Sequence, residues 1–369
     1  MSKNILIASV LKPVDDTRML EKLAVSIRNL TGFSINVVGF KGKITEHDKI
    51  SVVPLFNFDR VSFLKRLFAG VRFLIFALNS KPDYLIINTH ELVLPAILLK
   101  WICNTTIIYD IRENYILNTK HATHYSTLSK ILIQSLLKWR NYMAHLFMDY
   151  FILAEKIYQK QMNFPPDKTY VLENKCSAPN FISTKTERNP FQIIFTGTLA
   201  EHTGIFECII FFKTIHQTDP RWNLVIAGHC ALPEILKKIK INISDNNSIT
   251  LIGGENHVPH SVISHLIMQS GIGFIHYRNT PIVKNKMPTK LYEYLGYKLQ
   301  ILFYEPNEWI AFAEKYQPIL CPSPIDRSNP SNFIQKMIPA IQETYTTDPD
   351  LYWETEWEKS GFKNIFDLS

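Results

Sequence analysis

The chain has 369 residues, of which 46% are hydrophobic, 12% aromatic and 20% charged. This length is too great for one typical hydrophobic core and predicts two domains, each large enough to bury an interior of its own. The net charge is +7, with Lys and Arg spread along the chain rather than gathered in a tail. Because no helix-turn-helix, zinc-finger or aromatic-basic motif is present, we expect acidic ligands or an anionic membrane surface as partners and no nucleic acid.

The cysteines and the N-terminus indicate a reducing compartment. The five cysteines are odd in number and widely spaced, and most lie in apolar runs. We therefore expect reduced core residues, and neither a disulfide framework nor a metal cluster. The apolar run near the N-terminus is short and starts a domain, so a signal peptide is not expected and a cytoplasmic location follows. The most apolar window, 58–78, contains four Lys or Arg residues, which argues against a membrane-spanning helix.

The first half of the chain alternates strand and helix patterns. Continuous apolar runs of strand length lie at 4–10, 33–40, 50–56, 83–89, 105–111, 149–154 and 168–174. Helical periodicity separates them at 17–32, 59–80, 92–103 and 127–147, with a short helix after 154. Strands that are apolar throughout and separated by helices predict a parallel sheet covered on both faces.

A polar break at 175–190 predicts a linker, after which the alternation restarts. Strands are expected at 191–197, 223–228, 248–254, 271–277 and 300–304, and helices at 204–217, 233–241, 258–270 and after Pro288. We therefore predict an α/β protein with two doubly wound domains, 1–178 and 190–345. A ligand is expected at the carboxyl ends of the strands, in the cleft between the domains. The tail at 346–369 is long enough to cross back to the first domain.

The stretch 281–304 has the features of an anion site. Pro288 suits the first turn of a helix, and Lys290 and Glu293, three residues apart, lie on one face of it. Lys284 and Lys286 precede this helix, whose N-terminal amides favour an anion. A carboxylate one turn further in can hold paired hydroxyls, so phosphate and ribose are the expected ligand. The alternative is an ordinary surface helix with solvated lysines.

A second motif, FTGTLAEHTGI, starts at 195 and runs from a strand through a loop into a helix. Gly197 and Gly204 bracket the loop and would let the backbone approach a diphosphate, while the helix points its amides at it. His202 lies in the same loop as a candidate contact. The spacing fits neither G-x-G-x-x-G nor a P-loop, so a plain strand-to-helix turn is the alternative.

Together these motifs resemble the retaining nucleotide-sugar glycosyltransferases of the GT-B fold, in particular glycosyltransferase family 4 of bacterial surface polysaccharides. The resemblance rests on FTGTLAEHTGI, on AGH at 227–229, on the P-x-K-x-x-E-Y pattern from Pro288 to Tyr294, and on IYDIREN at 108–114. It covers nearly the full length. It implies two Rossmann-like domains that face a central cleft, and a sugar transfer that needs no metal or other cofactor.

The resemblance also implies roles for individual residues. Lys290 would bind the diphosphate and Glu293 the ribose, and these two, with Asp110 and Glu113, are the expected catalytic residues. The expected donor-binding set is Gly197, Thr198, His202, Gly204, Arg278, Lys284, Lys286, Lys290, Leu291 and Glu293. On the acceptor side, in the first domain, the expected residues are His90, Glu91 and Arg112. For His90 and Glu91, which follow a strand, capping of the next helix is the alternative.

The chain departs from the family at the diphosphate site. Thr198 and Thr203 stand where many members have an arginine and a lysine. Lys284, Lys286 or Arg278 would then supply the missing charge. Arg112 stands where relatives often have histidine.

Two segments of the first domain combine apolar and basic residues, 58–78 and 128–148. Such helices could dock on the inner face of the cytoplasmic membrane, where a lipid-linked acceptor would be presented. Core packing against the sheet explains the same apolar faces.

The sequence thus predicts a cytoplasmic glycosyltransferase that moves a sugar from a nucleotide donor to a glycan or lipid-linked acceptor in surface polysaccharide biosynthesis. Two alternatives stay open. One is a sugar-nucleotide epimerase or phosphorylase of the same fold, and the other is a non-catalytic partner protein, which Thr198 and Thr203 would explain.

Overall fold

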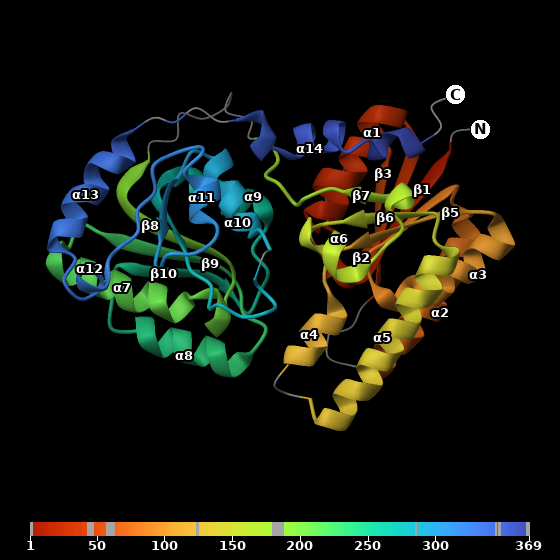
Figure 1. Ribbon diagram of the computed structural model, residues 1–369, viewed down its shortest axis with the longest axis horizontal. Coiled ribbons are helices and arrows are strands. Elements are labelled where there is room, and N and C mark those ends of the chain that lie inside the picture. The colour runs from red at the N-terminus through yellow and green to blue at the C-terminus, as the bar shows by residue number, and fades with distance from the viewer. Residues whose placement is uncertain are drawn as a thin grey trace. The chain divides into compact units, whose positions relative to one another are not determined.

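The computed structural model describes residues 3–42, 48–56, 63–122, 125–178, 188–284, 286–343, 345 and 348–366, without the side chains of 63–67 and 342. The chain forms two compact units (Figure 1). Unit 1 comprises Met1–Asn174 and Trp353–Ser369, and unit 2 comprises Lys175–Tyr352. The chain therefore leaves unit 1, builds unit 2 and returns to unit 1. Parts of the expected helix 59–80 and linker 175–190 fall at 59–62 and 179–187, outside the described residues.

Unit 1 contains a parallel sheet of seven strands in the order β3-β2-β1-β4-β5-β6-β7. Its strands are β1 (Asn4–Pro13), β2 (Ser34–Phe40), β3 (Ile50–Phe56), β4 (Tyr84–Ile87), β5 (Thr106–Ile111), β6 (Tyr150–Leu153) and β7 (Thr169–Val171). Residues 5–8 of the central strand β1 are fully buried. A strand covered on both faces needs apolar side chains on both, which is why its sequence runs apolar without alternation.

Helices cover both faces of this sheet. One face packs against α2 (Phe63–Ser80), α3 (Val93–Cys103) and α5 (Thr127–Phe147). The other packs against the π-helix η1 (Arg18–Ala24), α1 (Val25–Thr31), α14 (Trp353–Lys359) and the turn η6 (Phe362–Ile365). Shorter elements complete the unit: η2 (His90–Leu92), α4 (Tyr115–His121), α6 (Ile157–Met162) and η3 (Pro166–Lys168). Among the described helices, none combines the length and apolar character that crossing a bilayer requires.

Unit 2 repeats the plan with a parallel sheet of five strands in the order β10-β9-β8-β11-β12. Its strands are β8 (Asn189–Thr198), β9 (Asn223–His229), β10 (Ile249–Gly254), β11 (Ser270–Ile275) and β12 (Gln300–Phe303). One core contains α7 (Ile205–Thr218), α8 (Pro233–Ile243) and α13 (Ser331–Gln342). The other contains α9 (His260–Gln269), α10 (Thr289–Gly296) and α11 (Ile310–Ala313). The short elements are η4 (Glu201–Thr203), α12 (Pro324–Ser328) and η5 (Pro349–Leu351).

The α/β fold class with two doubly wound parallel sheets is confirmed, and helix 127–147 has the bounds that the periodicity predicts. The helix expected at 17–32 is different, because its first seven residues are π-helical. In this segment the charged groups of Arg18 and Lys22 lie over the ring of Trp353, at 5.5 and 5.9 Å from its centroid. Hydrophobic periodicity predicts that a helix is present, but it does not distinguish a π-helix from an α-helix.

Asp110, at the end of β5, belongs to a buried ion-pair network. Its side chain is 0% exposed, and Arg18 donates to it from Nε (3.1 Å to both oxygens) and Nη2 (2.8 Å to Oδ1). Arg112 donates from Nε to Asp110 Oδ2 at 2.9 Å and from Nη1 to Asp16 at 2.8 Å. Burial alone would raise the pKa of Asp110, but the charges of Arg18 and Arg112 outweigh it and hold that pKa below its ordinary value. Asp110, expected as a catalytic residue, is therefore fully buried at the centre of an ion-pair network, and a catalytic role for it stays a prediction.

Replacing Asp110 by alanine should destabilise unit 1. Arg18 and Arg112 would lose their shared partner while staying buried, which costs roughly 3–5 kcal/mol of unfolding free energy. Urea unfolding followed by circular dichroism measures this loss, and Asp167→Ala, at an exposed position, is the control with an expected change within about 0.5 kcal/mol. Equal effects of the two substitutions would contradict the network.

The ion pair between Asp16 and Arg112 should make the stability of unit 1 depend on pH. Because the pKa of Asp16 falls from 3.8 to about 2 in the folded chain, its contribution to the unfolding free energy should be lost as the pH is lowered through that window.

Candidate functional site

The carboxyl ends of β8 and β11 form the topological switch point of the unit 2 sheet. The two strands are neighbours, but β8 continues through α7 to β9 on one side, and β11 continues through α10 to β12 on the other. Loops that diverge from such a pair leave room for a ligand in open parallel sheets. The glycine loop follows β8 and the anion-binding motif follows β11, so the fold brings both sequence motifs to this point.

Two glycines let the loop after β8 approach its neighbours closely. Gly204 has a φ of +79°, and a Cβ added there would lie 2.7 Å from the Cβ of His276, directly after β11. A Cβ on Gly228, in β9, would lie 1.7 Å from the carbonyl oxygen of Gly197. The backbone N–H of Arg278 donates to the carbonyl oxygen of His202 at 3.0 Å. The loop is therefore held against the ends of both neighbouring strands.

Thr203 fastens the glycine loop internally. Its buried hydroxyl accepts from the Ala200 N–H at 3.2 Å and lies 2.8 Å from the carbonyl oxygens of Ala200 and Thr198, to one of which it donates. The side chain of Thr198, in contrast, is exposed. Both threonines replace expected cations. Thr203 stabilises the conformation of the loop, and Thr198 lies on its surface.

Tyr294 ties α10 to β8. Its hydroxyl accepts from the Thr196 N–H at 3.2 Å and lies 3.1 Å from Thr196 Oγ1, and the ring is fully buried. This contact fixes the N-terminal turn of α10 beside the glycine loop. Accordingly, a Cβ on Gly197 would lie 3.9 Å from the Cε of Lys290, in that first turn.

Lys290 holds a buried ammonium group without a hydrogen-bond partner among the described residues. The residue is 6% exposed, and its Nζ lies 4.1 Å from the ring centroid of Phe195 and 5.0 Å from that of Tyr277. The negative faces of aromatic rings stabilise a cation but do not satisfy its N–H donors. Burial lowers the pKa of Lys290 from 10.5 to about 8, although the nearby Glu293 opposes the shift. An anion at the glycine loop would supply the missing acceptors.

Glu293 lies one turn further along α10. Its carboxylate is largely shielded, and Oε1 is 3.4 Å from Nε2 of His260, at the start of α9. The structure therefore brings His260 next to the expected ribose-binding carboxylate.

The other expected donor-side residues divide into two groups. Arg278 is at the site but forms an ion pair with Glu207 of α7, at 3.0 Å. His202 lies beside it with an exposed side chain, and partial burial of its imidazole, then the charges of Lys290 and Arg278, lower the pKa of that group. Lys284 is exposed and Lys286 partly buried, in the connection between β11 and α10.

Leu291 does not take the expected role. Its side chain is completely buried in the core, and its N–H donates to the carbonyl oxygen of Pro288 at 2.9 Å. Neither group can reach a ligand, so we leave Leu291 out of the site.

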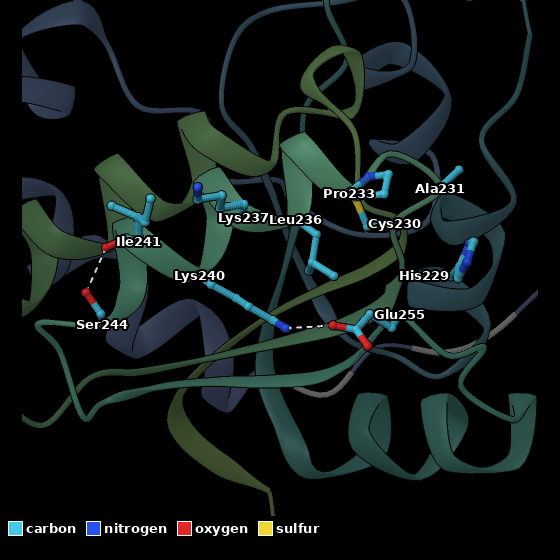
Figure 2. A pocket seen from close by; sticks show the side chains of 10 residues that line it. All are labelled: His229, Cys230, Ala231, Pro233, Leu236, Lys237, Lys240, Ile241, Ser244 and Glu255. Carbon is cyan, nitrogen blue, oxygen red and sulfur yellow. Dashed lines mark hydrogen bonds and ion pairs between the residues drawn. The ribbon is translucent and has the colours of Figure 1, made fainter.

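A pocket of about 730 Å³ opens at the same edge of the sheet, at the ends of β9 and β10 (Figure 2). Its lining residues are His229, Cys230, Ala231, Pro233, Leu236, Lys237, Lys240, Ile241, Ser244 and Glu255. Lys240 forms an ion pair with Glu255 at 2.9 Å, and the ring of His229 stacks on that of His257 at 4.1 Å.

In unit 1, β1 and β4 form the corresponding switch point, and polar residues follow β4. Nδ1 of His90 lies 3.4 Å from the carboxylate of Glu91, and the His90 ring contacts Tyr115. Asn88, which the sequence reading did not single out, is 2% exposed, and neither its amide nitrogen nor its oxygen has a hydrogen-bond partner among the described residues. Buried amides are normally paired, so this residue is a candidate ligand contact.

The expected residues after β5 do not form one group. Glu113 accepts from Asn118 at 3.1 Å and is partly buried. Arg112 uses its Nε and Nη1 in the ion-pair network with Asp110. That network, rather than an acceptor, accounts for the acidic and basic residues of IYDIREN.

Replacing Thr203 by valine should loosen the glycine loop, because it removes the hydroxyl that joins Ala200 to Thr198. The expected loss in unfolding free energy is roughly 1–3 kcal/mol, the cost of leaving buried polar groups unpaired. Thr198→Val is the matched control, expected within about 0.5 kcal/mol because its side chain is exposed. Thermal unfolding of the two variants measures the difference, and a neutral Thr203→Val would show that the loop does not depend on this hydroxyl.

Comparison with known proteins gives matches at the level of structure. No family model matches the chain, and no curated protein matches it. Anabaena HepE, in a structure with UDP and glucose, is 14% identical with a TM-score of 0.60, over 100% of this chain and 96% of that chain.

Two other solved structures match over a similar length. The sucrose-phosphate synthase of Thermosynechococcus elongatus is 11% identical with a TM-score of 0.62, over 100% of both chains. AviGT4, a glycosyltransferase involved in avilamycin A biosynthesis, is 10% identical with a TM-score of 0.58, over 98% of this chain and 94% of that chain. At such identities the likeness concerns the fold, and the chain has the GT-B fold of these glycosyltransferases.

Proposed function

We propose that this protein is a glycosyltransferase that moves a sugar from a nucleoside diphosphate donor to a glycan or lipid-linked acceptor. The observation that carries the proposal is the buried, unpartnered ammonium of Lys290 beside the glycine loop. An unpaired buried charge is costly and is retained where a ligand of opposite charge completes it. The match to HepE in a structure with UDP and glucose supports a nucleotide sugar as that ligand.

In the proposed donor complex the diphosphate lies between the glycine loop and Lys290. The first turn of α7 directs its amides toward the same point, which favours an anion. Arg278 adds a second cation when it turns from Glu207 toward the phosphates, and this replaces the charge that Thr198 and Thr203 lack. Glu293 then holds the ribose hydroxyls.

The pocket at the ends of β9 and β10 provides space for the base of the donor. The ring of His229, which lines the pocket and stacks on the ring of His257, offers an aromatic surface, and aromatic surfaces stack on bases without selecting one. The identity of the base therefore follows from hydrogen bonds at the pocket's edge.

The chemistry that this arrangement can perform is stabilisation of a leaving group. The bond between the anomeric carbon and the diphosphate oxygen breaks, and the diphosphate keeps the electron pair. Charge develops on that oxygen, where a preorganised ammonium and helix amides act without reorganisation. The acceptor oxygen forms the new bond to the anomeric carbon, and its proton passes to the departing diphosphate.

The finer features of the proposal rest on the sequence resemblance. They are retention of the anomeric configuration, independence from metal ions and other cofactors, action in surface polysaccharide biosynthesis and a cytoplasmic location. On the acceptor side we propose the region after β4, where the side-chain amide of Asn88 is buried without a hydrogen-bond partner among the described residues and is followed by His90 and Glu91. Glu113 stays in the proposal as a partly buried carboxylate after β5.

Replacing Lys290 by methionine should weaken the binding of UDP, GDP or ADP by at least about tenfold. The lost hydrogen bond to a charged group is worth about 1.5–3 kcal/mol. Calorimetric titration of the three nucleotides measures the effect, with Lys315→Met at an exposed site of unit 2 as the control. Unliganded Lys290→Met should be at least as stable as the wild type, because it no longer buries an unpaired charge. Absence of binding by all three nucleotides to the wild type would overturn the proposal and favour a non-catalytic protein.

The pH dependence of nucleotide affinity is a second test of the role of Lys290. Free Lys290 loses its proton above pH about 8, whereas a terminal phosphate, with a second pKa of about 6, is already ionised. Affinity should therefore be constant between about pH 7 and 8 and fall by up to about tenfold per pH unit above that range. Over the window from about 8 to 10.5 the unfolded chain binds more protons, so unliganded stability should rise with pH. Lys290→Met should lack both trends.

Replacing Asn88 by leucine should impair transfer without impairing folding. The substitution removes two buried polar atoms that lack partners, so the unfolding free energy should stay equal or rise. Nucleotide affinity should not change, while release of nucleoside diphosphate stimulated by a panel of alkyl glycosides should fall by at least about tenfold, as expected for a site that loses a hydrogen bond to its substrate. Asn4→Leu, which removes a hydrogen bond to the Ser80 carbonyl, is the control that should lose stability instead. A destabilised Asn88→Leu with normal transfer would assign Asn88 a structural role.

A further inference from the structure

Helix α5 exposes a continuous apolar strip to solvent. Its members are Leu128, Ile131, Leu132, Leu136, Trp139, Tyr142 and Leu146, each between 40% and 68% exposed. At 3.6 residues per turn these positions fall on one side of the helix. Leu137 and Ala144, on the opposite side, are buried, and Ala144 belongs to the core on this face of the sheet. Core packing therefore accounts for only one of the two apolar sides of α5.

The neighbouring helices continue this surface. Phe68, Val71 and Ile75 on α2, and Leu98, Trp101 and Ile102 on α3, recur at the same spacing of three and four residues and have exposures within the same range. All three helices cover the same face of the sheet, so their outer sides point away from it together (Figure 1). Trp101 of α3 contacts Phe147 of α5 with ring centroids 5.6 Å apart. We call the outer sides of α2, α3 and α5 the apolar face of unit 1.

The charged residues of these three helices have one sign. The segments Phe63–Ser80, Val93–Cys103 and Thr127–Phe147 contain no Asp or Glu. Arg72 and Lys138 are exposed, and Lys138 borders the strip of α5. Trp101, Trp139 and Tyr142 add the amphipathic rings that are enriched where hydrocarbon meets headgroups. A soluble monomer rarely exposes so much contiguous apolar surface, and this one has basic flanks.

We infer that the apolar face of unit 1 docks on an anionic lipid bilayer. The apolar strips enter the interface, and the basic side chains meet the headgroups. The inference adds α3 to the two segments that the sequence indicated. It rests on the proposed function in one respect, because a bilayer is where a lipid-linked acceptor would be found. It can fail separately from that function, because vesicle binding requires neither a nucleotide sugar nor turnover.

Co-sedimentation of the full chain with vesicles tests the inference. The protein should pellet with vesicles of phosphatidylcholine and phosphatidylglycerol, pellet less with phosphatidylcholine alone, and lose part of its binding as salt is raised. Leu132→Ser combined with Trp139→Ser should reduce the bound fraction severalfold. Ile210→Ser combined with Ile325→Ser, at exposed apolar positions of unit 2, should leave it unchanged.

Single substitutions separate the contribution of the basic residues to vesicle binding from that of the apolar residues. Lys138→Glu should reduce binding to the anionic vesicles only, and Lys315→Glu in unit 2 is its control. The vesicles should shift the tryptophan emission to shorter wavelength in the wild type, and Trp139→Phe should diminish that shift without diminishing binding. Thermal unfolding and nucleotide titration of each variant show that folding and the donor site are intact.

Two results would overturn the inference. One is a wild-type protein that does not pellet above the level without vesicles, or pellets equally after the paired substitution on α5. The other is a stable dimer in light scattering that the α5 substitutions dissociate, since the occupant of the face would then be a second copy of the chain.

Discussion

The ammonium group of Lys290 is buried against two aromatic rings, with no hydrogen-bond partner among the described residues, and one end of the unit 2 sheet is arranged around this unfavourable state. Phe195 comes from β8, Tyr277 follows β11 and Lys290 itself starts α10, so three segments must be placed together. The switch point of the sheet places the first two. Tyr294, one turn beyond Lys290, then locks α10 to β8 through Thr196. The stability of the surrounding core offsets the cost of the buried charge until a ligand removes it.

Two buried polar side chains of unit 1, Asp110 and Asn88, differ in whether the fold provides them with hydrogen-bond partners. Asp110 carries a full charge and yet has every oxygen hydrogen-bonded by Arg18 and Arg112. Asn88 carries no charge, and neither of its polar atoms has a partner among the described residues. Charge and burial alone therefore do not mark a reactive residue. What distinguishes the two is whether the fold has already satisfied the group.

The sequence predicted the helices and strands well, but it said much less about which side chains contact one another. The uniform apolar strands and the intervening periodic helices were sufficient for both parallel sheets, since burial on two faces leaves few other residue choices. IYDIREN looked like an acidic catalytic loop because its binding partner, Arg18, lies 92 residues away along the chain. Thr203 looked like a lost cation, although its hydroxyl fastens the loop locally. The segment 128–148 was recognised as apolar and basic, but periodicity alone did not show which apolar positions of α5 stay exposed, because it does not tell an outer side of a helix from an inner one.

The return of the chain to unit 1 affects how this protein can be made. Trp353, Trp357, Phe362 and Phe366 form part of the core on one face of the first sheet. During synthesis that face is complete in sequence only after all of unit 2 has been added, and domains tend to fold as they emerge. Unit 2 can therefore reach its final structure first, while the strands of unit 1 wait with one apolar face uncovered. The segment that follows unit 2 in the chain completes the core of the first domain, which makes that domain the more exposed to chaperones and to aggregation during translation.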